Sequence, residues 1–70
     1  MEAPPNFFDV YGINNYKIGR LDTNGLIWSG EVIVMRIVEG KIYSMHQKYL
    51  GQFIDGVGKT DRGELIFTVS

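Results

Sequence analysis

A short pattern occurs three times in this chain at constant spacing. Tetrapeptides that begin and end with an apolar residue start at positions 18, 34 and 50, which is a step of 16 residues. The three copies are Ile18–Leu21, Val34–Ile37 and Leu50–Phe53, and the glycines that follow them are Gly25, Gly40 and Gly56. Self-similarity at a fixed period is typical of a tandem-repeat protein, so the repeat is the strongest constraint on the fold.

The chain from Phe7 onward has the composition of short strands. Runs of β-branched and aromatic residues alternate with Gly, Asn, Asp or Ser, which predicts an all-β meander of about eight strands. Nine glycines interrupt every helical pattern, so we expect no helix longer than one turn. Residues 1–6 contain Pro4 and Pro5 and are expected to form an extended tail, whereas residues 7–70 form a single all-β domain.

The closing glycines predict tight turns. Asn24–Gly25 and Asp55–Gly56 are typical of two-residue type I′ hairpin turns, in which both central residues have φ > 0. Glu39–Gly40 fits this turn less well, because glutamate tolerates a positive φ poorly. We therefore expect a longer loop or a bulge at Glu39–Gly40.

The repeat divides the domain into four units, 7–25, 26–40, 41–56 and 57–70, each predicted to form one hairpin. In the first strands of three units an apolar residue precedes an aromatic one: Phe7–Phe8, Ile27–Trp28 and Ile42–Tyr43. The return strands align Ile18, Val34, Leu50 and Leu65, and three residues later Leu21, Ile37, Phe53 and Thr68. Unit four has Val57–Gly58 in place of the apolar-aromatic pair and is therefore interpreted as a degenerate closing repeat.

These motifs resemble those of a known family. Ile18-Gly19-Arg20-Leu21, Ile42-Tyr43, Leu50-Gly51-Gln52-Phe53 and Asp55-Gly56 are similar to the repeats of small bacterial β-flower domains, in particular the four-fold β-flower. The resemblance covers nearly the whole chain after Asn6. It implies hairpins arranged like petals around a pseudo-four-fold axis, and it implies no activity. The sequence departs from the pattern at Met35 and Ile66, aligned with Gly19 and Gly51, and at Gly58, aligned with the aromatic residue.

A second fold remains open from the sequence. A short meander can also close as an SH3-like β-barrel, which is the alternative to the flower-like arrangement.

Composition limits the possible functions. The chain has no cysteine and one histidine, so a disulfide, a thiolate site or a multi-histidine metal site is impossible, and no cofactor is expected. A net charge of -1 and a pI of about 5.6 argue against nucleic acid as a partner. The apolar runs are too short to cross a membrane, and the N-terminus lacks the pattern of a signal peptide. The absence of cysteine favours the cytoplasm.

Three groups of residues have side chains that could carry chemistry. His46 lies in a polar turn without an obvious orienting carboxylate, and we interpret it as a solvated turn residue. The acidic residues Asp22, Asp55, Asp61 and Glu64 are expected near one another in repeat-equivalent turns, where such residues usually bond to their own backbone. Gly56–Thr60 ends in Gly-Lys-Thr, but Phe53 stands where a phosphate loop needs its first glycine. No catalytic residue is therefore predicted.

Aromatic residues provide the candidate binding face. Phe8, Trp28 and Tyr43 point away from their apolar neighbours, because side chains alternate along a strand. Both faces of these strands are thus apolar, which favours core packing or a homo-oligomer, most simply a dimer. The sequence predicts a non-enzymatic structural or protein-interaction module. The rivals are a module that binds peptide, sugar or base on this face, and an enzyme whose site forms between subunits.

Overall fold

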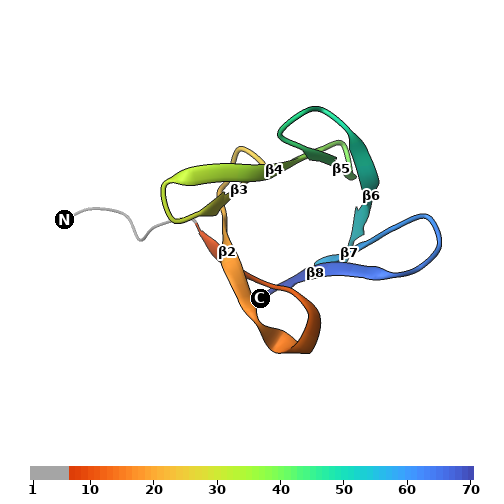
Figure 1. Ribbon diagram of the computed structural model, residues 1–70, viewed down its shortest axis with the longest axis horizontal. Helices are drawn as coiled ribbons and strands as arrows, with labels where there is room; N and C mark the ends of the chain where they lie inside the picture. Colours follow the sequence, from red (N-terminus) through yellow and green to blue (C-terminus); the bar gives the residue numbers. More distant parts are fainter. Residues whose placement is uncertain (1–6) are drawn as a thin grey trace.

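Eight antiparallel strands form a closed barrel in which each strand pairs with its neighbours in sequence and β8 pairs with β1 (Figure 1). The computed structural model describes residues 7–70, so the tail expected at residues 1–6 lies outside the described residues. The strands are β1 (Phe8–Tyr11), β2 (Lys17–Leu21), β3 (Leu26–Ser29), β4 (Val32–Val38), β5 (Lys41–Ser44), β6 (Tyr49–Ile54), β7 (Val57–Lys59) and β8 (Leu65–Val69). The all-β meander predicted from the sequence is confirmed.

Each predicted unit contributes one hairpin. The hairpins β1–β2, β3–β4, β5–β6 and β7–β8 follow one another around the barrel, and their tips splay outwards (Figure 1). In residues 7–70 the one helical element is a single 3-10 turn, η1 (Ile13–Asn15). The expectation that no helix exceeds one turn is therefore confirmed for this part of the chain.

One β-bulge recurs in every hairpin, immediately after the inward-facing residue of the first strand. The four cross-strand pairs at this point are Val10↔Gly19, Ile27↔Met35, Ile42↔Gly51 and Gly58↔Phe67. A bulge bends the strand and increases its twist, and repeating it at equivalent positions helps a short sheet to curve into a closed barrel.

The register corrects the alignment of two units. In unit one the equivalent of Ile27–Trp28 is Val10–Tyr11, so the placement of Phe7–Phe8 at that position is wrong. In unit four the step of 16 residues continues to Ile66 and Val69, so the alignment of Leu65 and Thr68 with the return-strand positions is also wrong. Phe67 concealed the correct register, because a bulky side chain stands where units one and three have glycine.

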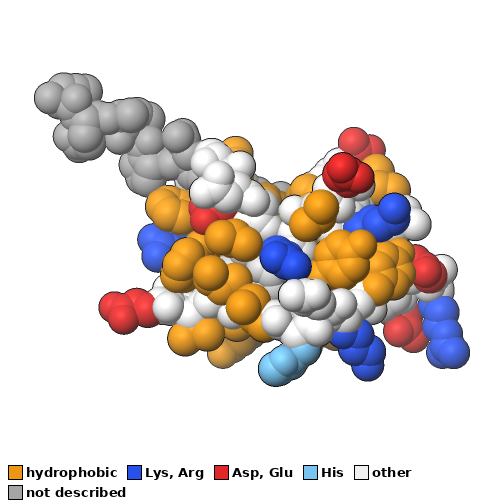
Figure 2. All heavy atoms as spheres, turned by 90° about the horizontal axis from the view of Figure 1, so that it is seen from above, with side chains coloured by type: hydrophobic (Ala, Val, Ile, Leu, Met, Phe, Trp, Pro, Cys, Tyr) orange, Lys and Arg blue, Asp and Glu red, His pale blue; other side chains and the backbone are white. Residues whose placement is uncertain are grey.

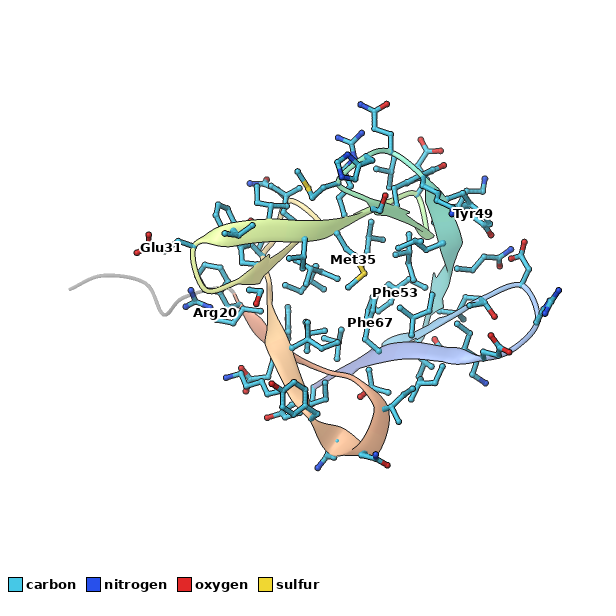
Figure 3. The ribbon with its side chains drawn as sticks, in the orientation of Figure 1. Arg20, Glu31, Met35, Tyr49, Phe53 and Phe67 are labelled. Carbon is cyan, nitrogen blue, oxygen red and sulfur yellow. The ribbon has the colours of Figure 1, made fainter. Side chains whose placement is uncertain are left out.

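The core is small and draws on all four hairpins. The buried apolar side chains are Val10, Leu21, Ile27, Ile42 and Phe67. Met35, Phe53 and Phe67 point into the barrel (Figure 3), where the Phe53 and Phe67 ring centroids lie 5.7 Å apart.

Gly58 makes room for Phe67. A Cβ atom at position 58 would lie 2.8 Å from Cδ1 of Ile42 and 3.0 Å from two carbons of the Phe67 ring. Unit four therefore exchanges the glycine and the large residue between its two strands. This exchange, and not a loss of pattern, explains why its sequence looks degenerate.

Two of the three glycine turns between hairpins are alike. Asp55 and Gly56 have φ of 53° and 81°, and Glu39 and Gly40 have φ of 53° and 80°. The two-residue turn at Asp55–Gly56 is confirmed, whereas the longer loop or bulge expected at Glu39–Gly40 is wrong, because Val38 pairs directly with Lys41. The carbonyl oxygens of Gly40 and Gly56 accept backbone hydrogen bonds from Phe53 and Val69 in the next hairpin, which holds both turns in the same place.

The turn at Asn24–Gly25 has a different geometry from the one predicted. Only Gly25 has a positive φ (84°), and the connection runs from Asp22 to Leu26. The N–H of Asp22 donates to the carbonyl of Leu26, and the N–H of Gly25 donates to the carbonyl of Asp22. The same two backbone bonds close the loops that start at Gly12, Ser44 and Thr60. The Asp22 side chain favours this longer loop because it accepts hydrogen bonds from the N–H groups of Asn24 and Leu26.

We expect valine substitutions at the three closing glycines to lower the free energy of unfolding by different amounts. Gly40→Val and Gly56→Val should each lower the free energy of unfolding by about 1–2 kcal/mol, because a β-branched residue is strained at positive φ. Gly25→Val should cost more, since its Cβ would also lie 2.5 Å from the carbonyl oxygen of Ile37. Urea unfolding of the three variants measures the order, and a Gly25→Val protein as stable as Gly40→Val would contradict it.

Candidate functional site

The outer surface of the barrel is organised by the four seams between consecutive hairpins. At each seam one residue of a return strand faces one residue of the next first strand. These pairs are Arg20↔Trp28, Arg36↔Tyr43, Gln52↔Lys59 and Thr68↔Tyr11. They alternate with the inward-facing residues of the same strands, so they point away from the core. Three seams thus present an aromatic side chain, and the seam between the third and fourth hairpins presents a lysine.

The first seam is held by Trp28 and Asp22. The indole Nε1–H of Trp28 donates to Oδ2 of Asp22 over 2.9 Å, while Oδ1 accepts the two backbone N–H groups of its own loop. Partial desolvation on its own would raise the pKa of Asp22, but the bonds from Trp28, Leu26 and Asn24 outweigh it and lower that pKa below its ordinary value. Trp28 is partly buried, so its ring belongs neither to the deep core nor to a free surface.

Removing this carboxylate should destabilise the fold in a pH-dependent way. Asp22→Asn should lower the free energy of unfolding at neutral pH by about 1 kcal/mol, because the charged acceptor of three hydrogen bonds is lost. A lowered pKa in the folded state stabilises the protein fully above the ordinary pKa of 3.8, and this stabilisation disappears as the pH falls through the folded pKa. The difference between wild type and variant in urea unfolding should therefore shrink in acid. A difference that stays constant with pH would contradict the assignment.

The second seam carries Arg36 and Tyr43, and Tyr49 lies next to Tyr43 on β6. Tyr43 faces Arg36 across the seam and Tyr49 within its own hairpin, and the two tyrosine rings meet edge to face with centroids 6.0 Å apart. The Tyr49 hydroxyl donates to Oδ1 of Asp61 over 2.7 Å, and this bond, followed by partial desolvation, raises the pKa of Tyr49. Figure 3 places Tyr49 on the outer side of β6.

The predicted aromatic face is divided by the structure. Trp28 and Tyr43 occupy equivalent positions at neighbouring seams. Phe8 pairs with Leu21 inside the first hairpin and is half-exposed, and the seam position that corresponds to Trp28 and Tyr43 belongs to Tyr11. The grouping of Phe8 with Trp28 and Tyr43 in one column is therefore wrong, for the same register reason as above.

The other candidate residues lie in turns. His46 is exposed, and its backbone N–H donates to Oγ of Ser44. Gly58 and Lys59 end β7, and Thr60 starts a hairpin loop in which its Oγ1 accepts the N–H groups of Arg62 and Glu64. The four acidic residues do not form the single cluster that the sequence predicts, because Asp22 bonds to Trp28 at the first seam, whereas Asp55 and Asp61 lie along the third. Within residues 7–70 no three His, Cys, Asp or Glu side chains come close enough to hold a metal ion.

An open groove lies at the third seam, and sequence reasoning missed it. Its floor comes from the outer face of β6 and β7, and its ends come from the adjoining turns. The lining residues are Gln52, Ile54, Asp55, Val57, Lys59, Thr60 and Asp61, around a volume of about 630 Å³. We call this feature the third-seam groove. The signal for it was the lysine at position 59, where the other repeats have an aromatic residue.

The fold and surface define a class of protein, an all-β repeat protein whose four hairpins close into an eight-stranded barrel with outward-facing seams. Comparison of the chain with protein-family models, curated proteins and solved structures gave no significant match. A search of residues 7–70 found no helix with the length and apolar character needed to span a bilayer.

Proposed function

We propose that this chain is a β-flower-type domain that acts in the cytoplasm as a non-enzymatic protein-interaction module. Its simplest partner is a second copy, so that the protein works as a homo-oligomer and most simply as a dimer. The surface that we assign to this interaction consists of Arg36 and Tyr43 at the second seam, together with the adjacent Tyr49.

The observation that carries this proposal is the environment of Arg36. This side chain is partly buried between its cross-strand neighbours Leu26 and Tyr43. The ion pair found among residues 7–70 joins Lys17 to Asp9, and Arg36 has no carboxylate within ion-pair distance in this part of the chain. Arginine and tyrosine dominate the energetic centres of protein interfaces, because they combine apolar area with donors that need a partner.

Exposed apolar side chains elsewhere on the barrel also favour a protein partner. Figure 2 shows apolar side chains gathered in groups on one side of the barrel, with basic side chains among them. Large apolar residues are exposed near the tips of all four hairpins, namely Ile13, Val32, Met45 and Leu65. A partner that covers such residues removes apolar area from water, which favours association.

Light scattering tests this proposal. At rising concentration the mass should exceed the 7.9 kDa of one chain and approach that of a dimer. Arg36→Glu should shift the protein toward monomer without a large change in its melting temperature, because it removes the guanidinium donors and most of the apolar stem that the partner is proposed to cover, at a position only partly buried in one chain. Arg62→Glu, the same charge change at an exposed hairpin tip, is the matched control and should leave the mass unchanged. A wild-type protein that stays monomeric at high concentration would overturn the proposed self-association.

The alternative function, small-ligand binding on Phe8, Trp28 and Tyr43, has less support at those residues. Phe8 lies apart from the other two, and the indole N–H of Trp28 is already bound to Asp22. A ligand on Trp28 would have to use its ring face alone.

A further inference from the structure

We propose that the third-seam groove binds one aromatic side chain that carries a hydrogen-bond donor, a tyrosine or tryptophan of a partner peptide. The inference goes beyond the interaction assigned to Arg36, because it concerns a different seam and a defined ligand chemistry. It rests on a comparison of the third seam with its three equivalents.

The first seam shows how an aromatic ring fills such a groove. Trp28 starts from β3, lies across the seam and reaches Asp22, the residue that follows β2 of the preceding hairpin. Leu21 and Phe53 are equivalent positions of the return strands. The residues that follow them, Asp22 and Ile54, are therefore equivalent at the first and third seams. A ring at the third seam in the orientation of Trp28 would therefore extend over Ile54.

At the third seam no aromatic residue occupies the seam position itself, and the nearby ring of Tyr49 bonds to Asp61 at one end of the groove. Lys59 occupies the position of Tyr11, Trp28 and Tyr43, and the space over the β6–β7 pair remains open. Ile54, which pairs with Val57, is 61% exposed, and its repeat equivalent Val38, which pairs with Lys41, is 45% exposed. The groove is thus the place that an aromatic residue fills in the other repeats.

The lining of the groove matches a ring with a polar end. Ile54 and Val57 face each other across β6 and β7 and form an apolar floor. Asp55 lies at one end and Asp61 at the other, and no hydrogen bond to the Asp55 carboxylate or to Oδ2 of Asp61 occurs among the described residues. A phenol or indole donor can reach a carboxylate here as the indole of Trp28 reaches Asp22. A volume of about 630 Å³ is also ample for such a ligand.

The direct test is a titration of the isotope-labelled protein followed by amide chemical shifts. N-acetyl-tyrosinamide and N-acetyl-tryptophanamide represent residues within a peptide, and N-acetyl-phenylalaninamide lacks the donor. The first two should shift the amides of Ile54, Val57 and Lys59 and bind at least several-fold more tightly than the third. Free L-tyrosine should bind no better than the amide. Shifts absent from the groove, equal binding of all three amides, or preference for the free amino acid would each overturn the proposal.

A substitution tests the comparison between seams. Lys59→Trp should supply the missing ring from within the chain, raise the melting temperature and weaken probe binding at least tenfold. Lys48→Trp, at the exposed tip of the third hairpin, is the control and should change neither. Because Ile54 is mostly exposed, Ile54→Ser should remain folded and also lose probe binding. A Lys59→Trp protein with unchanged melting temperature and unchanged binding would show that the groove is not an aromatic site. Light scattering of Arg36→Glu reads out the self-association independently, so either proposal can fail without the other.

Discussion

Gly51→Ala and Gly19→Ala should each destabilise this protein severely, by about 3 kcal/mol or more, because even one methyl group overlaps backbone that has no room to move. A Cβ at position 51 would lie 2.0 Å from the carbonyl oxygen of Lys59, and one at position 19 would lie 1.8 Å from that of Trp28. In both cases the oxygen belongs to the first strand of the next hairpin. Either the strands separate at that seam or the barrel fails to close.

Urea unfolding measures both variants, and Gly63→Ala is the matched control. Gly63 has a φ of +89°, but a Cβ there would have no atom within 4 Å. The free energy of unfolding of the control should therefore fall only by the backbone strain, about 1 kcal/mol. If Gly51→Ala were no less stable than Gly63→Ala, the close approach of β6 and β7 would be wrong.

Phe67→Ala should have the second large effect, a loss of about 3–5 kcal/mol, because it removes the largest fully buried side chain of a small core. Gly58→Val alone should cost about 1–3 kcal/mol, since its added carbons compete with the Phe67 ring and with Ile42. The double variant restores the order of units one and three, where the first strand carries the large residue. It should therefore be more stable than the sum of the single effects predicts, by about 1–3 kcal/mol.

A double-mutant cycle in urea measures this coupling. The comparison is the double variant of Phe53→Ala and Gly58→Val. Phe53 pairs with Gly58 across the seam between β6 and β7, whereas the partner of Gly58 within the fourth hairpin is Phe67. Strict additivity of Gly58→Val and Phe67→Ala would contradict the exchange of small and large residues within the fourth hairpin.

The candidate surface could be predicted only in part. Trp28 and Tyr43 were found because each follows an apolar residue at the start of a repeat, and this local order survives in the fold. The bond between Tyr49 and Asp61 joins residues of different hairpins, and no spacing rule connects them. Arg36 gave no signal either, because its lack of a carboxylate partner is a property of the folded surface.

The third-seam groove has a signal in the sequence of the fourth unit, at Gly58 and Lys59. The sequence alignment places Val57–Gly58 at the apolar-aromatic pair of the other units, whereas the register places Gly58–Lys59 there. In the structure Gly58 admits Phe67 to the core, and Lys59 leaves the outer seam open. The apparent loss of the repeat pattern in the fourth unit thus consists of two separate changes, Gly58 on the inner face of β7 and Lys59 on its outer face.

The sequence by itself determined that the chain forms four short hairpins, because turn residues and the alternation of side chains act over a few neighbouring positions. The step of 16 residues even holds at Phe67, where the residue type conceals it. Only the tertiary structure decided the closure of the barrel. Asp9 and Ser70 exchange backbone hydrogen bonds of 3.2 and 3.0 Å, and β1 pairs with β8, across the full length of the domain. Closure also decided which residue of each bulged pair enters the core. One interior is shared by four hairpins, so the space at Gly58 depends on the side chains of Ile42 and Phe67, and the space at Gly19 and Gly51 depends on the backbone of the next hairpin.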